Sequence, residues 1–115
     1  MRRLCAVFLL VPAFGFARPP GLPCKSWPVA MAEVTLQNAG LVKAGDFDES
    51  RTRATPVSFE KTGKDLYRQV FEIVLHSRAG REFHVITVNS ASSVECSMSG
   101  VDVYLIERKF SGDAP

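Results

Sequence analysis

Two histidines, His76 and His84, lie at the two ends of one predicted β-hairpin and could carry metal or acid–base chemistry. Imidazole nitrogens bind zinc and copper, and with a three-residue or five-residue loop these two residues would face each other across the strands. Glu72 or Glu82 would have to supply a third ligand. Because exposed histidines at strand ends are far commoner than metal ligands, we expect ordinary surface residues and no metal site. A metal-binding protein or small hydrolase that uses His76 and His84 is the alternative.

The segment 89–100, with the sequence NSASSVECSMSG, is the richest in hydroxyl groups. A nucleophilic serine needs a neighbouring base, but this segment contains no histidine and the chain has no G-x-S-x-G motif. Carboxylates are not paired at a spacing that indicates general acid and base catalysis, and the glycines stand singly rather than in a phosphate-binding loop. We therefore expect no catalytic residues, no cofactor and no enzymatic activity.

The first seventeen residues have the pattern of an export signal. Arg2 and Arg3 precede an apolar run that extends from Leu4 to Phe16, and small residues at Gly15 and Ala17 suit a signal peptidase. The run is shorter than the roughly 20 residues that a membrane span requires. The sequence therefore predicts a signal peptide at 1–17, a periplasmic or secreted protein, and no membrane insertion after the signal is removed.

Two cysteines, Cys24 and Cys96, follow the predicted signal, whereas Cys5 lies within it. In an oxidising compartment such a pair predicts a disulfide. Closing a loop of roughly 70 residues would stabilise a small domain by up to about 4 kcal/mol. The bond would also hold the 89–100 loop still, so that Glu95, Ser97 and Met98 present a fixed surface to a protein partner.

Charge argues against a nucleic-acid partner. The chain has 14 Lys and Arg residues against 12 Asp and Glu residues, and Arg2 and Arg3 account for the whole excess. The remaining basic side chains alternate with acidic ones, whereas phosphate binding needs a clustered basic face.

The elements that must position these residues begin with an extended, proline-rich leader at 18–25. One helix is expected over 27–39, followed by a polar connection and four strands. The spacing of the apolar residues predicts that the helix buries one apolar stripe, with Glu33 and Gln37 on the opposite side. The stripe consists of Trp27, Ala30, Met31, Val34 and Leu41. The strands are expected at 53–60, 66–76, 82–89 and 101–109.

These elements predict an α+β fold in which the helix packs on a four-stranded antiparallel meander in two layers. A single domain is expected over 26–110, with a tail at 111–115. The helix can cover one sheet face, so the outer face would carry an apolar patch that includes Tyr104 and adds to the partner surface. A strongly curled sheet with scattered outer apolar residues is the alternative. The other predicted patch members are Val70, Val74, Ile86, Val88 and Ile106.

Three segments, CKSWP at 24–28, GKDLYRQV at 63–70 and ECSMSGVDV at 95–103, give the chain after residue 17 a recognisable pattern. This pattern resembles a group of small exported bacterial proteins with one cysteine before the helix and one before the last strand. The resemblance implies an immunity protein or an inhibitor of a secreted toxin or enzyme, and it assigns no residue roles. The sequence is thus interpreted as an exported binding protein that masks a protein partner, with a structural envelope component as a further alternative.

Overall fold

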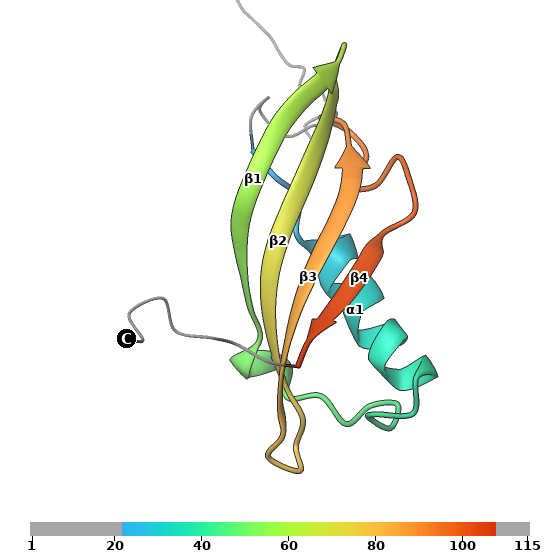
Figure 1. The fold of residues 1–115 in the computed structure, drawn as a ribbon, viewed down its shortest axis with the longest axis vertical. Helices are drawn as coiled ribbons and strands as arrows, with labels where there is room; N and C mark the ends of the chain where they lie inside the picture. The colour runs from blue at the N-terminus through green and yellow to red at the C-terminus, as the bar shows by residue number, and fades with distance from the viewer. Residues whose placement is uncertain (1–21, 108–115) are drawn as a thin grey trace, which may run out of the picture.

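A computed structural model describes residues 22–107 of the chain. One helix is followed by a short 3-10 helix and four strands (Figure 1). The elements are α1 (Ser26–Asn38), η1 (Glu49–Arg51), β1 (Arg53–Gly63), β2 (Leu66–His76), β3 (Glu82–Ala91) and β4 (Asp102–Ile106). Over the described residues, no helix combines the length and the apolar character needed to cross a membrane.

The four strands form one antiparallel sheet in the order β1-β2-β3-β4, so each strand pairs with its neighbour in sequence. The predicted α+β class, with one helix and a four-stranded antiparallel sheet, is confirmed. The second strand has the predicted bounds, whereas β1 extends three residues further, to Gly63, β3 extends two residues further, to Ala91, and β4 is shorter than expected. Among the described residues β4 pairs with β3 from Asp102 to Ile106, and positions 108–109 of its predicted span lie outside the described part of the chain.

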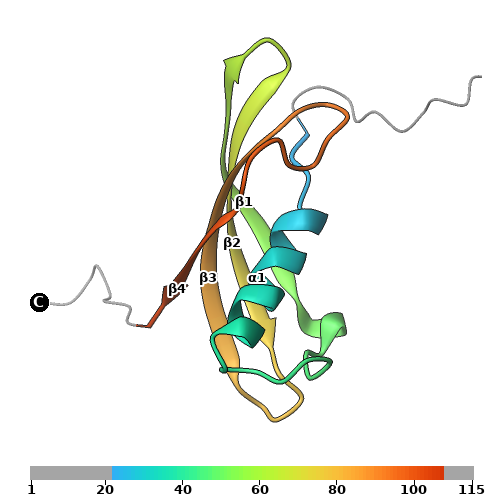
Figure 2. The ribbon, with the colours of Figure 1, turned by 90° about the vertical axis from the view of Figure 1, so that its right-hand side faces the viewer.

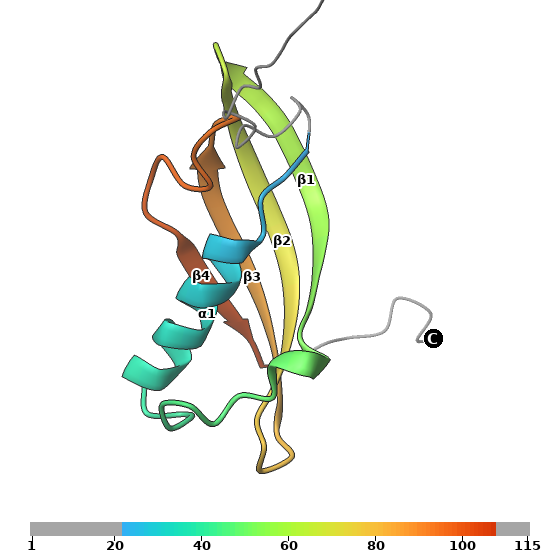
Figure 3. The same ribbon diagram turned by 180° about the vertical axis from the view of Figure 1, so that it is seen from behind.

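Side-chain alternation along β2 and β3 places one set of residues under α1. The helix lies across this inner face of the sheet (Figures 2 and 3). The core combines helix residues, the connection after the helix and the inner positions of the sheet. Its buried members are Ala32, Leu36, Val42, Phe47, Phe71, Ile73, Leu75, Phe83 and Val85.

The buried stripe of α1 differs from the predicted one. Pro28, Ala32 and Leu36 are buried at a spacing of four residues, whereas Trp27 is 48% exposed and Val34 is also exposed. The helix carries apolar residues on more than one side, so periodicity alone could not choose between them.

The end of α1 explains which stripe faces the sheet. The Gly40 N–H donates to the Gln37 carbonyl and the Leu41 N–H to the Leu36 carbonyl, at 2.9 and 3.0 Å. This is a Schellman motif, and it requires the left-handed backbone that Gly40 adopts at φ 79°. The motif brings Leu41 against the same core as Leu36, so the helix is fixed with its Leu36 side toward the sheet.

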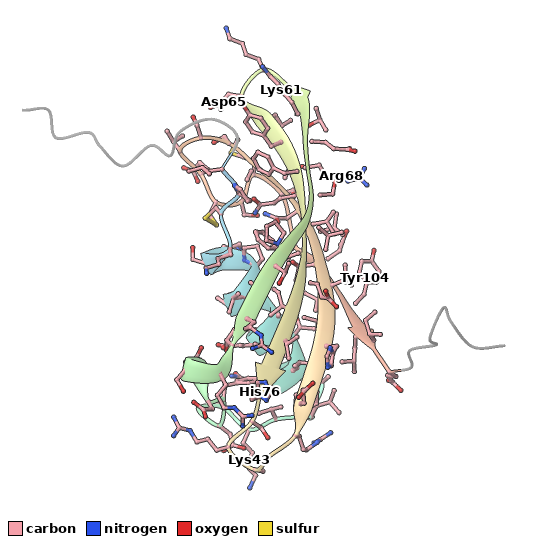
Figure 4. The ribbon with its side chains drawn as sticks, turned by 90° about the vertical axis from the view of Figure 1, so that its left-hand side faces the viewer. Lys43, Lys61, Asp65, Arg68, His76 and Tyr104 are labelled. Carbon is pink, nitrogen blue, oxygen red and sulfur yellow. A yellow bond between two sulfur atoms is a disulfide. The ribbon has the colours of Figure 1, made fainter. Side chains whose placement is uncertain are left out.

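The outer face of the sheet carries apolar side chains in adjacent rows. Val70 lies opposite Val88, and Ile86 lies opposite Tyr104. The valines and Ile86 are half-buried, whereas Tyr104 is 54% exposed. Figure 4 shows Tyr104 pointing away from the sheet on the side opposite to the disulfide.

Thr87, on β3, offers a test of the core. It lies opposite Phe71 and Val103, it is fully buried, and its hydroxyl oxygen has no hydrogen-bond partner. Replacing a buried, unpaired hydroxyl by a methyl group of the same shape removes a desolvation cost.

We expect Thr87→Val to leave the free energy of unfolding unchanged or to raise it by about 1 kcal/mol, measured by urea denaturation. Thr87→Ala, which also removes a methyl group, should lower stability by about 1 kcal/mol. A loss of more than about 1 kcal/mol in the valine variant would contradict this interpretation of the core.

Candidate functional site

The predicted disulfide between Cys24 and Cys96 is present, with the two Cα atoms 5.3 Å apart. It joins Cys24, two residues before the start of α1, to Cys96 in the loop between β3 and β4, across a sequence separation of 72. The Trp27 N–H also donates to the Cys96 sulfur at 3.4 Å. The first turn of α1 and this loop are therefore fixed to each other at one end of the molecule.

Beneath the disulfide lies a fully buried amide, that of Gln69 on β2. Its Oε1 atom accepts the Cys24 N–H at 3.0 Å, and its Nε2 atom donates to the Cys24 carbonyl at 2.7 Å. The side chain thus satisfies both backbone groups of Cys24, as a neighbouring strand would. The leader is attached to the sheet through this pair of bonds.

A second amide, Asn89 on β3, stands directly opposite Gln69 in the sheet. Its Oδ1 atom accepts from Gln69 Nε2 at 3.1 Å, and its Nδ2 atom donates to the Cys96 carbonyl and to the Ser97 hydroxyl, both at 3.1 Å. The two amides therefore hold the backbone of both cysteines. The sequence analysis did not select these two amides. The signal that could have found them is a polar residue at an inward-facing position of a strand whose other inward residues are apolar.

Serine hydroxyl groups brace the loop that carries Cys96. Ser92 Oγ accepts the backbone N–H groups of Val94 and Glu95, at 3.3 and 3.0 Å. The Asp65 carboxylate, in the turn between β1 and β2, accepts both the N–H and the hydroxyl of Ser93, at 3.1 and 2.8 Å. The loop is thereby attached to the neighbouring hairpin, whose tip carries Asp65 in Figure 4.

The second half of the loop is held in the same way. Ser97 donates to the Ser99 carbonyl at 2.6 Å, and Ser99 Oγ accepts the Ser90 N–H at 2.9 Å. The Met98 N–H donates to the Ser90 carbonyl at 2.6 Å. The side chain of Met98 is nevertheless 55% exposed. A fixed backbone thus presents an exposed apolar side chain.

A shallow hollow of about 400 Å³ lies between this loop and the start of α1. Its lining residues are Ser26, Trp27, Glu95, Cys96, Ser97 and Ser99. Trp27, Val94, Glu95 and Met98 are exposed around the hollow and the disulfide, and we call these four residues the disulfide-end surface.

The structure separates the predicted partner-binding residues into two places. Glu95 and Ser97 line the hollow, and Met98 follows Ser97 on the same loop. Tyr104 instead lies on the outer face of the sheet (Figure 4). The exposed Trp27, which the helical pattern assigned to the core, joins the first group.

The two histidines do not face each other as expected. The five-residue connection 77–81 pairs His76 with Glu82 and pairs His84 with Val74. His76 is buried, at 8% exposure, so the expectation of two ordinary surface histidines was wrong for this residue. His84 Nε2 lies 2.6 Å from Glu82 Oε2, and this hydrogen bond holds the pKa of Glu82 below its usual value. Over residues 22–107, no group of three or more His, Cys, Asp and Glu side chains could hold a metal ion.

An open cavity of about 1000 Å³ lies between the connection after α1 and the β2–β3 turn. Neither a histidine nor a cysteine lines it. The Arg81 guanidinium donates to the Leu41 carbonyl at 2.9 Å and lies over the Phe83 ring, and Ser77 Oγ accepts the Arg81 N–H. Arg81 and Ser77 are thus engaged in structural contacts, and we do not assign a site there.

Comparisons with protein-family models, with curated proteins and with solved structures gave no match for this chain.

The amide network leads to a stability prediction. Gln69→Met keeps the approximate volume but leaves the Cys24 N–H and carbonyl without partners. Each unsatisfied group costs about 1–3 kcal/mol, so the free energy of unfolding should fall by about 2–4 kcal/mol. Gln37→Met, on the half-buried side of α1, is the matched control and should change it by less than about 0.5 kcal/mol. If Gln69→Met lowered the free energy of unfolding as little as Gln37→Met does, the hydrogen bonds of Gln69 would contribute little to stability.

The disulfide leads to a second prediction at this site. The protein purified without reductant should show no alkylation at Cys24 or Cys96 by mass spectrometry, and reduction should make both react. Reduction should also lower the free energy of unfolding by up to about 4 kcal/mol, because the unfolded chain regains the entropy of an open loop. Alkylation of either residue before reduction would contradict the pairing.

Proposed function

We propose that this chain is an exported, non-enzymatic binding protein that masks a protein partner through the disulfide-end surface. The observation that carries the proposal is the exposed Trp27, held at the start of a helix whose first turn is bonded to Cys96. Tryptophan is enriched among the residues that dominate binding energies, because it covers a large area and has few rotatable bonds.

Rigidity supports this assignment. The disulfide, the Gln69 and Asn89 amides and the serine hydrogen bonds connect the leader, the helix and the loop at many points. A surface that is already ordered loses little conformational entropy when a partner binds. An exposed methionine such as Met98 also adapts its shape to different apolar neighbours.

Two features favour binding over catalysis. The hydroxyl groups of Ser92, Ser93, Ser97 and Ser99 form hydrogen bonds within or beside the loop, and none of these bonds is to a histidine. His84, the more exposed of the two histidines, forms its hydrogen bond with Glu82. Both residues lie at the start of β3, at the opposite end of that strand from this loop.

We propose a secreted toxin or enzyme as the partner, so that the protein acts as an immunity or inhibitor protein in the periplasm or outside the cell. The predicted signal peptide supports export, and the disulfide is consistent with an oxidising compartment. Tyr104 and Ile106 on the outer sheet face are also exposed, and we propose this face as the second candidate contact.

Capture of the partner from the producing cell by the processed protein, followed by titration calorimetry with the isolated partner, tests the proposal. Trp27→Ala and Met98→Ala should each weaken binding at least about tenfold, equivalent to about 1.4 kcal/mol, without changing the fold. Glu95→Lys should reverse the local charge and weaken binding to a similar degree.

Lys43→Ala, at the other end of the molecule (Figure 4), is the matched control and should bind like the wild type. Tyr104→Phe and Tyr104→Ala separate the two surfaces. If both Tyr104 variants bind normally and the Trp27 and Met98 variants do not, the disulfide-end surface is the contact. Unchanged binding in the Trp27, Glu95 and Met98 variants would reject it.

A further inference from the structure

The side of α1 that faces away from the sheet carries a second apolar stripe. Its members are Trp27, Ala30, Met31 and Val34, the four helix residues whose spacing predicted burial. Trp27 is 48% exposed and Val34 is 41% exposed, whereas the two residues between them are half-buried. The helix therefore has one apolar stripe toward the sheet and another toward solvent. We call these four residues the outer helix stripe.

No other described element covers the outer helix stripe (Figures 2 and 3). The helix also lacks the charged outer side that is typical of a surface helix. Between Ser26 and Asn38, Glu33 is the single charged residue, and one oxygen of its carboxyl group is inaccessible to solvent. A helix that is apolar on opposite sides is normally buried on both of them. A contact with a second molecule would complete this pattern.

The outer helix stripe is complementary to itself. Trp27 and Val34 are about 10 Å apart along the helix axis, with Ala30 and Met31 midway between them. If a second copy packs antiparallel about a twofold axis at this midpoint, each Trp27 lies against the Val34 of the other copy. The small side chain of Ala30 allows the two helix axes to approach to roughly 8 Å. Because the stripe is uncharged, this pairing brings no like charges together within it.

Charges at the two ends of α1 favour the antiparallel arrangement. Glu95 is the one charged side chain that lines the hollow beside Trp27. The open cavity at the other end of the helix is lined by Lys43, Asp46 and Arg81, which together carry a net positive charge. Antiparallel pairing places Glu95 of each copy near the positive end of the other, whereas parallel pairing places equal charges together. Contacts of this kind set the orientation of a complex more than its affinity.

We propose that the chain forms a twofold-symmetric dimer in which the outer helix stripes of two copies pack antiparallel. This dimer goes beyond the proposed masking function and does not depend on it, although Trp27 belongs to both surfaces. The stripe is small beside the roughly 800 Å² that each side of a stable interface buries. A dissociation constant of about 1 to 100 µM is therefore expected.

Sedimentation of the processed, oxidised protein alone tests the dimer. Between about 1 and 500 µM, monomer should convert to dimer. Trp27 is the one tryptophan of the chain, so its fluorescence reports on the contact. Quenching by iodide should fall about twofold over the same range, because the centre of an interface excludes water. A protein that stays monomeric up to about 500 µM, or that dimerises with unchanged quenching, would overturn the proposal and leave the stripe to a different molecule.

Two exposed valines provide a matched pair of variants. Val34→Lys places a charge within the contact and should weaken the dimer at least about tenfold without changing the urea midpoint. Val57→Lys, on β1, replaces a valine that is 60% exposed and should associate like the wild type. Equal dissociation constants for these two variants would show that α1 is not the contact.

A charge exchange tests the antiparallel orientation. Glu95→Lys and Lys43→Glu should each weaken the dimer at least about threefold, and the double variant should restore it. A double variant that associates more weakly than both single variants would overturn the antiparallel arrangement.

The dimer and the proposed partner binding are decided by separate measurements. Val34 lies outside the disulfide-end surface, so Val34→Lys should lose the dimer and still bind the isolated partner like the wild type. A failed sedimentation test rejects the dimer alone, since it is carried out without the partner. Normal partner binding by Trp27→Ala and Met98→Ala rejects the proposed function and leaves the dimer to be decided by Val34→Lys.

Discussion

The buried amide of Gln69 is the contact on which the arrangement at the disulfide end depends. A backbone segment that crosses the end of a sheet without joining it as a strand has an N–H and a carbonyl that must be satisfied. Gln69 supplies one acceptor and one donor to the same residue, Cys24, at 3.0 and 2.7 Å. Because the amide is itself fully buried, its polar atoms would be costly without these partners. Gln69 and Cys24 therefore each satisfy the polar groups of the other, and this pair of hydrogen bonds fixes the position of Cys24 on the sheet.

The disulfide and the amides do different physical work. The covalent bond restricts the unfolded chain, since it connects residues 72 apart, and a model based on loop entropy attributes most of its effect to that state. The hydrogen bonds of Gln69 and Asn89 act in the folded state, where they set the orientation of both cysteine backbones. One constraint makes the chain compact, and the other decides where the loop lies. A well-defined surface needs both.

The sequence was informative where one physical signal dominated. Alternation along β2 and the oxidising context of two cysteines predicted a strand with its correct bounds and a disulfide. It was uninformative where two signals competed. Apolar residues on several sides of α1 left its orientation open, and the Schellman motif at Gly40 places Leu41 against the same core as Leu36. The pairing of His76 with Glu82 differs from the expected one because the loop spans 77–81, and the position of the loop sets the register.

For the candidate site, the sequence predicted the loop but not its support. Glu95, Ser97 and Met98 were selected because a disulfide would hold them, and they lie together beside the cysteines. Trp27 was assigned to the core because of its place in the helical spacing of apolar residues, and its exposure follows from the rotation of the helix.

The free edge of β1 has a consequence for the behaviour of the protein in concentrated solution. This edge strand is 11 residues long, and an unpaired strand of that length can template the addition of another chain. Pro56 removes one donor from it, and the register shift between Pro56 and Ser58 changes its direction. Charged side chains at Arg53 and Lys61 stand near its two ends. These features divide the edge into short, charged pieces, which disfavours the regular stacking of chains through this edge.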